Sequence, residues 1–140
     1  MFNGKLMDPK TKNDFVFRIG GEAGWGIATG AELLAQVCLN LGYHVFSSKD
    51  YASQIKGGHN YHTIRISSQL VGADVDNVDL LLALDEETLK RHSSKVCAQG
   101  VILYDNKYED KMAQIVKDAR SAKDSRYFFL PLQKLEKEPG

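Results

Sequence analysis

The 140-residue sequence is poor in cysteine and proline and carries no excess charge of either sign. Its two cysteines, Cys38 and Cys97, stand alone, so there is no CxxC pair and no spacing typical of a zinc or iron–sulfur site. A chain of this length buries roughly two thirds of its unfolded surface and needs no disulfide to fold. We therefore expect a cytoplasmic protein that holds no metal ion itself.

The balance of charge also narrows the range of partners. Lysine plus arginine and aspartate plus glutamate number 18 each, which argues against nucleic acid, because binding to a phosphate backbone depends on a basic patch. The longest apolar run, Leu80–Leu84, is far shorter than the about 20 residues that cross a bilayer, so we expect no membrane partner. Residues 1–13 lack the apolar core of a signal peptide and are expected to form a flexible lead-in.

The first half of the chain predicts a strand, a glycine loop, a helix and then two strands in succession. A β-rich run over 14–19 ends at a Gly-Gly pair, and 27–41 has apolar residues at helical spacing. Residues 43–47 and 59–67 indicate strands with no helix between them, so a β-hairpin is inserted. Ser68-Gln69 predicts a turn into a further short strand at Leu70–Val71.

The second half alternates strands and helices. Apolar runs over 78–84 and 100–104 predict buried strands, and 126–130 a last strand. Asp85 is placed to cap a following helix that ends in Lys90, Arg91 and His92, and 108–122 predicts another helix. The fold class we expect is α/β, a three-layer Rossmann-like sandwich with an inserted β-hairpin, formed as one domain by residues 14–140.

Two loops carry the residues most capable of binding a ligand. The first, Gly20 to Gly30, lies between a strand and a helix, where glycines and a helix N-terminus favour an anion such as phosphate. Its spacing matches neither the dinucleotide fingerprint nor a P-loop, so the glycines could equally serve a tight turn and close helix–sheet packing. The second loop, Ser47 to Asn60, should lie at the same edge of the sheet, or it could be an ordinary polar surface loop.

The histidines and acidic residues offer no further site. His59 and His62 stand three apart on a predicted strand, so their side chains should face opposite sides and share no metal ion. His44 is expected to be a sheet residue and His92 a cation at a helix end. No self-sufficient set of catalytic residues is visible.

Several motifs in order resemble the γ domain of 2-oxoacid:acceptor oxidoreductases, which use ferredoxin or flavodoxin. The resemblance covers residues 14–105 and rests on the segments Ile19–Leu34, Tyr43–Tyr51, Ile55–Asn60, Ile64–Ser67, Asp79–Asp85 and Gly100–Asp105. The Gly-Glu-Ala-Gly loop with Lys-Gly-Gly-His-Asn is most similar to γ domains fused to the N-terminus of an α subunit.

This resemblance implies a component of an enzyme that oxidatively decarboxylates a 2-oxoacid, of the pyruvate, 2-ketoisovalerate or 2-oxoglutarate type, to an acyl-coenzyme A. It implies that α and β chains or domains hold thiamine diphosphate, magnesium and iron–sulfur clusters and pass electrons to ferredoxin or flavodoxin. This chain alone would be inactive, and it could also form a homo-oligomer. The implied candidates for contact with coenzyme A or its phosphates are Gly21, Gly24, Trp25, Gly26, Lys49, Lys56, Gly57, Gly58, His59 and Asn60.

Two departures qualify the resemblance. Trp25 stands where the family often has a smaller polar residue or tyrosine, which narrows the glycine loop. The chain ends at Gly140, short of the C-terminal helical segment of a γ domain, so we expect a fragment or a truncated homologue with an uncovered edge or apolar patch. A free-standing nucleotide-binding module and a pure interaction domain are the alternatives.

Overall fold

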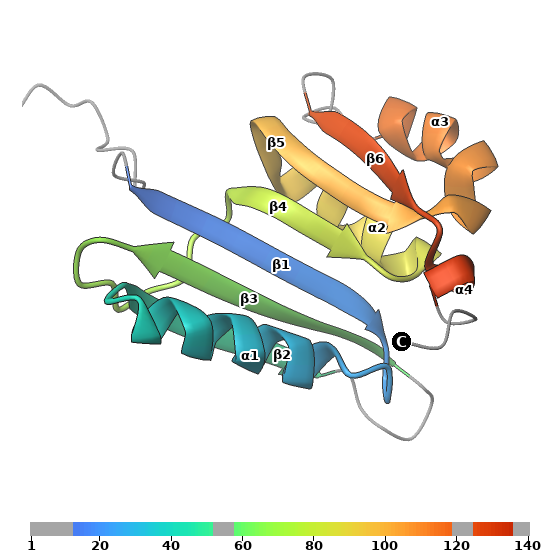
Figure 1. Ribbon diagram of the computed structural model, residues 1–140. Coiled ribbons are helices and arrows are strands. Elements are labelled where there is room, and N and C mark those ends of the chain that lie inside the picture. The colour runs from blue at the N-terminus through green and yellow to red at the C-terminus, as the bar shows by residue number, and fades with distance from the viewer. Residues whose placement is uncertain (1–12, 52–57, 119–124, 136–140) are drawn as a thin grey trace, which may run out of the picture.

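The computed structural model describes residues 13–51, 58–118 and 125–135, which form one six-stranded sheet flanked by helices (Figure 1). Of the predicted lead-in, residues 1–13, the structure describes only Asn13. The strands are β1 (Asp14–Glu22), β2 (His44–Tyr51), β3 (His59–Ser67), β4 (Val78–Ala83), β5 (Val96–Asp105) and β6 (Arg126–Leu130). The helices are α1 (Ile27–Asn40), α2 (Glu86–His92), α3 (Glu109–Asp118) and α4 (Leu132–Leu135), with single 3₁₀ turns η2 (Ser93–Lys95) and η3 (Asn106–Tyr108).

The sheet is mixed, in the order β2-β3-β1-β4-β5-β6. Strands β1, β4, β5 and β6 run parallel, whereas β3 is antiparallel to both β1 and β2. The predicted hairpin insertion is therefore confirmed as β2 and β3. The short strand predicted at Leu70–Val71 is wrong, because the chain leaves the sheet after Ser67 and residues 68–77, which lead to β4, belong to no strand.

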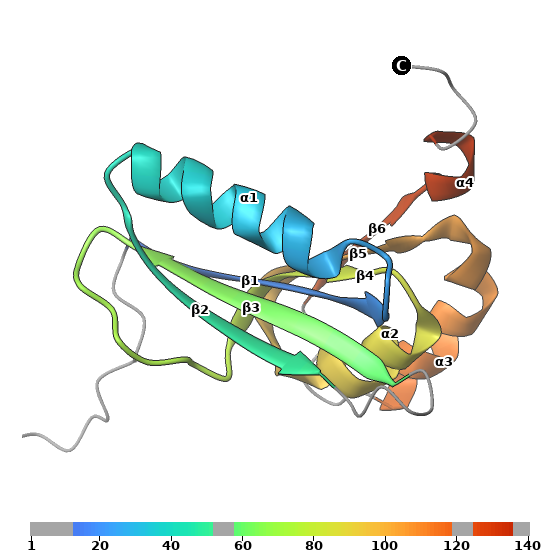
Figure 2. The same ribbon diagram turned by 90° about the horizontal axis from the view of Figure 1, so that it is seen from below.

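Helices cover both faces of the sheet, so the predicted three-layer α/β arrangement is confirmed. Figure 2 shows α1 on one face and α2 and α3 on the other. On the α1 face a core cluster forms from Phe17, Ile19, Ile27, Ala31 and Ile64. On the opposite face a second cluster includes Val16, Val78, Leu81, Ala83, Leu89, Val96, Ile102, Tyr104, Met112 and Ile115. In the part of the chain that the structure describes, no helix is long and apolar enough to cross a membrane.

Helix α1 covers only the half of its face formed by β1, β2 and β3. Figure 1 looks onto this face, and no helix of the described residues stands in front of β4 and β5. Leu33 and Val37 of α1 and its C-cap residue Leu41 repeat every four residues and are 64%, 54% and 70% exposed. They lie on another side of the helix from Glu32, which forms an ion pair with Lys49 of β2. We call the following set the uncovered apolar face: Leu33, Val37, Leu41, Leu80, Leu82, Val101, Leu103 and Phe128.

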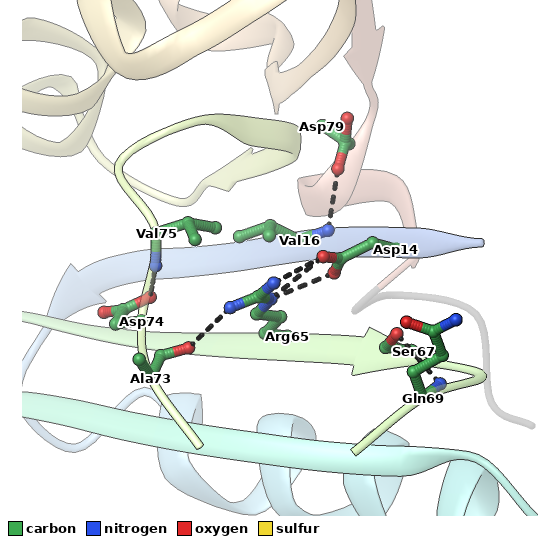
Figure 3. Close-up of polar contacts among 9 residues, drawn as sticks. All are labelled: Asp14, Val16, Arg65, Ser67, Gln69, Ala73, Asp74, Val75 and Asp79. Atoms are coloured by element: carbon green, nitrogen blue, oxygen red, sulfur yellow. Dashed lines mark hydrogen bonds and ion pairs between the residues drawn. The ribbon is translucent and has the colours of Figure 1, made fainter. Parts of the chain in front are cut away.

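A polar network near the start of β1 and the end of β3 ties these strands to the segment 68–77 between β3 and β4 (Figure 3). The buried Asp14 carboxylate accepts from Arg65 Nη2 at 2.6 Å and from Nε at 3.0 Å, and Arg65 Nη1 donates to the Ala73 carbonyl at 3.0 Å. The amide of Val16 donates to Asp79 Oδ2 at 2.7 Å. These bonds fix the path from β3 to β4.

Candidate functional site

Strand pairing brings the two predicted loops to one edge of the sheet. Glu22 at the end of β1 lies opposite His59 at the start of β3, and Tyr51 at the end of β2 lies opposite Asn60. Because β4 and β5 run parallel to β1, the turns that follow them reach the same edge. The described ends of both loops therefore meet at one edge, as expected, and this is the carboxyl edge where α/β sheets usually bind ligands.

The glycine loop turns sharply into α1. Gly24 and Gly26 have φ values of 90° and 75°, a left-handed conformation that side chains rarely adopt, and a Cβ atom on either would meet nothing within 4 Å. Gly21 is tightly packed, since a Cβ there would lie 3.0 Å from Leu84 Cβ. Turn geometry and helix–sheet packing therefore account for these three glycines, while their contact with a ligand stays a prediction.

The N-terminus of α1 is open to an anion. Among the described residues, no side chain caps it, and its first turn contains no acidic residue. The first backbone N–H groups of a helix lack partners within the helix and favour negative charge. This end of α1 can therefore hold a phosphate or a carboxylate.

A lysine that the sequence analysis did not single out stands beside Trp25. The Trp25 side chain is 45% exposed, and Lys107 Nζ, in η3 after β5, lies 5.6 Å from the centroid of its ring. Lys107 also lies 4.9 Å from the Tyr108 ring centroid and 3.4 Å from Asp105 Oδ2. Partial burial alone would lower the pKa of Lys107, but Tyr108 and Asp105 raise it, so the ammonium stays charged. The signal in the sequence was its position just after a buried parallel strand.

The candidates on β2 and β3 divide between the two faces of the sheet. Lys49 forms an ion pair with Glu32 of α1, on the α1 face, and the buried Asn60 Oδ1 on that face has no partner among the described residues. His59 lies on the opposite face and, with Glu22, Gly58, Asp85 and Glu87, lines a hollow of about 150 Å³. Lys56 and Gly57 lie outside the described residues. The structure thus brings His59 and Gly58 together and separates Lys49 from them.

Behind His59 lies a buried arginine that the sequence analysis also missed. Arg18 of β1 is 5% exposed; its Nε donates to Thr63 Oγ1 at 2.8 Å, and its Nη1 lies 3.2 Å from His92 Nδ1. Its guanidinium stands 5.0 Å from the Tyr61 ring centroid. His92 Nε2 in turn lies 2.8 Å from His59 Nε2. Arg18 was detectable only as the single charged residue inside an apolar strand.

Histidine protonation follows from this packing. Burial, and next the Arg18 guanidinium, lower the pKa of His92 to about 3. The expectation that His92 is a helix-end cation is therefore wrong, because its ring is buried against another cation rather than exposed to solvent. Burial also lowers the pKa of His59 and of His62. His62 contacts Ser47 on the α1 face, so His59 and His62 do face opposite sides as predicted.

Within the described ranges, no group of three or more histidine, cysteine, aspartate or glutamate side chains is arranged to hold a metal ion. What this edge offers instead is an uncapped helix N-terminus, the exposed Trp25 ring, the Lys107 ammonium and a histidine backed by a buried hydrogen-bond chain. These groups can bind and orient an anionic or aromatic ligand.

In comparisons with known proteins, the family model and the relatives that match are all ferredoxin-linked oxidoreductases. A family described as pyruvate ferredoxin/flavodoxin oxidoreductase matches residues 16–140. A 2-oxoacid:ferredoxin oxidoreductase subunit alpha from a Sulfolobus species is 33% identical over 91 residues, covering 65% of this chain and 14% of that protein. Subunit alpha of 2-oxoacid:ferredoxin oxidoreductase 1 from Aeropyrum pernix is 35% identical over 95 residues, covering 67% of this chain and 15% of that protein. The chain thus spans about one seventh of these relatives.

Solved structures share the fold. A 2-oxoglutarate:ferredoxin oxidoreductase from Magnetococcus marinus, with 2-oxoglutarate, coenzyme A and succinyl-CoA bound, matches with a TM-score of 0.75 at 24% identity, over 91% of this chain and 21% of that one. The pyruvate oxidoreductase subunit PORC from Thermotoga maritima matches with a TM-score of 0.66 at 21% identity, over 89% of this chain and 68% of that one. Both are similar to this chain in architecture.

Proposed function

The chain belongs to the pyruvate ferredoxin/flavodoxin oxidoreductase family, and from this premise we propose that it is the γ-type component of a 2-oxoacid oxidoreductase. The whole enzyme would oxidatively decarboxylate a 2-oxoacid to an acyl-coenzyme A and reduce ferredoxin or flavodoxin. The observation that carries the proposal is the carboxyl edge of the sheet, where the α1 N-terminus, Trp25 and Lys107 converge. This chain would contribute binding groups there, not the redox centres.

Coenzyme A fits the residues of this edge. Its phosphates would lie at the uncapped N-terminus of α1 and beside Lys107, which binds them as a point charge. Its adenine would stack on the half-exposed Trp25 ring. The hollow beside His59 is lined by Glu22, Asp85 and Glu87 and would repel phosphates, so the charged end of the carrier belongs on the Trp25 side. The remaining candidates for contact with coenzyme A are the backbones of Gly24, Gly26 and Gly58 and the side chain of Asn60.

The partners we propose are the α and β chains or domains of the same enzyme. They would hold thiamine diphosphate, magnesium and the iron–sulfur clusters, and the assembly would work in the cytoplasm, in keeping with two cysteines that form no disulfide. The relatives named subunit alpha are about seven times longer than the matched region. The uncovered apolar face, with α1 on one side and β4 and β5 as its floor, suits the packing of a helix from that remainder.

A titration tests the binding part of this proposal. Coenzyme A added to the 140-residue chain should change the fluorescence of Trp25, the single tryptophan. Lys107→Met should weaken the affinity about tenfold, because a hydrogen bond to a charged group contributes roughly 1.5–3 kcal/mol in general. Lys90→Met on α2, whose ammonium pairs with Glu86, is the matched control and should not change the affinity. Equal affinities for all three proteins would contradict the placement of the phosphates.

A further inference from the structure

Two histidine rings connect the buried Arg18 to the candidate edge in an unbroken chain of hydrogen bonds. Arg18 Nη1 contacts His92 Nδ1 at 3.2 Å, and His92 Nε2 contacts His59 Nε2 at 2.8 Å. The rings of His59 and His92 are 5.0 Å apart between centroids, and Tyr61 packs 4.4 Å from His92. The remaining nitrogen, His59 Nδ1, is buried and has no hydrogen-bond partner among the described residues.

The Arg18 guanidinium determines where the protons lie along this chain of hydrogen bonds. A guanidinium has only donors, so His92 Nδ1 must accept from Arg18 and carries no proton. A neutral imidazole has one N–H, which therefore sits on His92 Nε2. That N–H can point only at His59 Nε2, so His59 Nε2 is also an acceptor. The one N–H of His59 is left on Nδ1.

His59 cannot be cationic while this chain of hydrogen bonds is intact. A protonated His59 would donate from Nε2, and His92 would then need two bare nitrogens, which an imidazole does not have. The surroundings act in the same direction overall: burial, followed in part by Arg91, lowers the pKa of His59, although Asp85, Glu87 and Asp50 oppose it. His59 is thus a neutral ring with a defined tautomer.

We propose that Arg18 and His92 are positioning residues that hold His59 as a neutral Nδ1–H donor for a carbonyl oxygen bound at the carboxyl edge. The donor is buried and unpaired, which costs free energy until an acceptor arrives, so the site is arranged to recognise one. The acceptor is uncharged, because Glu22, Asp85 and Glu87 line the hollow next to His59 and disfavour an anion. An amide carbonyl meets both conditions.

The tautomer is tested in the isolated 140-residue chain, independently of any enzymatic activity. Long-range ¹⁵N–¹H correlation spectra at neutral pH distinguish protonated from bare ring nitrogens. We expect His59 to be protonated at Nδ1 and His92 at Nε2. A His59 ring protonated at Nε2, or at both nitrogens, overturns the proposal.

Two variants separate positioning from a merely structural role. His92→Gln keeps an amide oxygen to accept from Arg18 and an amide N–H to donate to His59, so the Nδ1–H signature of His59 should persist. His92→Met removes both, and His59 should shift to the Nε2–H tautomer that free imidazole favours in water. If the His59 signature is the same in both variants, His92 does not position it. If both variants shift it equally, the hydrogen-bond chain is not the cause.

The acceptor is tested with the two halves of coenzyme A, and this step rests on the proposed function. Pantetheine carries the amide carbonyls, whereas adenosine bisphosphate carries the phosphates. Pantetheine should move the His59 Nδ1–H resonance and adenosine bisphosphate should not. A shift seen only on addition of the α and β chains would assign the carbonyl to a partner peptide instead. No shift with any of these, or a shift with adenosine bisphosphate alone, overturns the carbonyl assignment while leaving the tautomer result intact.

Discussion

The buried ring of His92 should make the protein lose stability as the pH falls. Its pKa is about 3 in the folded protein and about 6.5 in an unfolded chain. Below pH 6.5 the unfolded state therefore binds the proton more tightly, and the free energy of unfolding decreases until the pH reaches the folded value. Above pH 6.5 both states are neutral at this ring, and it contributes no pH dependence.

The size of this effect follows from the shift. Full linkage for such a change in pKa corresponds to about 5 kcal/mol, and relaxation of the protein around the protonated ring reduces it to roughly 2–3 kcal/mol. His92→Gln keeps the hydrogen bonds and removes the titrating group. Between pH 6 and pH 4, we expect the free energy of unfolding of the natural protein to fall by about 1 kcal/mol per pH unit more than that of the variant.

Urea denaturation at a series of pH values measures the difference directly, since carboxylates titrate alike in both proteins. His44→Gln, at the exposed start of β2, controls for the loss of a histidine as such. Parallel stability curves for the natural protein and His92→Gln would refute the assignment of a neutral, buried His92.

Three further changes test the fold and its surfaces. Asp14→Asn should lower the free energy of unfolding by about 3–5 kcal/mol because it leaves the buried Arg65 charge uncompensated, whereas Asp76→Asn, in an exposed pair with Lys95, should cost less than about 1 kcal/mol in urea melts. Gly26→Ala, in the left-handed region, should lower the free energy of unfolding by about 1–2 kcal/mol. Gly30→Ala, inside α1 with open space around it, should raise it by up to about 1 kcal/mol, so the two melting temperatures should shift in opposite directions. Leu33→Glu should abolish co-elution with α and β chains without changing the melting temperature, and Gln36→Glu on the same helix should change neither; unchanged co-elution of Leu33→Glu would remove the uncovered apolar face as the interface.

Much of the fold could be predicted because its signals are local. The alternation over His59–Ser67 gives the bounds of β3, and Asp85 does cap α2 by accepting from the Thr88 amide at 2.8 Å. Local sequence signals did not predict the bounds of elements that depend on contacts with distant residues. β2 continues to Tyr51, through residues predicted as loop, because β3 supplies partners as far as Asn60.

Strand β5 was only partly predicted. It begins at Val96 rather than Gly100, because its pairing with β4 shifts register between Val78 and Leu80 and Gln99 adopts a φ of 66°. An irregular strand of this kind does not show the uniform apolar pattern of its second half. The glycine that looked like a boundary is an internal adjustment, where a Cβ would lie 2.5 Å from Val96 Cγ1.

The sequence predicted which edge of the sheet the two loops share, but not the contacts between the residues there. Loop order and the parallel-sheet rule were enough to bring Glu22 and His59 to one edge. The Arg18 to His92 contact joins residues 74 apart in the chain, and the Trp25 and Lys107 pair joins two different turns. Only the packed structure reveals such pairs, because burial of each partner depends on elements that the local sequence does not contain.

We propose above all that this chain is a working component of a 2-oxoacid oxidoreductase. The direct measurement is 2-oxoacid-dependent and coenzyme A-dependent reduction of ferredoxin by α and β chains that lack their own γ domain, with and without the 140-residue chain. We predict that turnover appears only when this chain is added, and that the chain alone shows none. Equal turnover with and without it, in a mixture whose α and β chains are proven active with their own γ domain, would contradict the account.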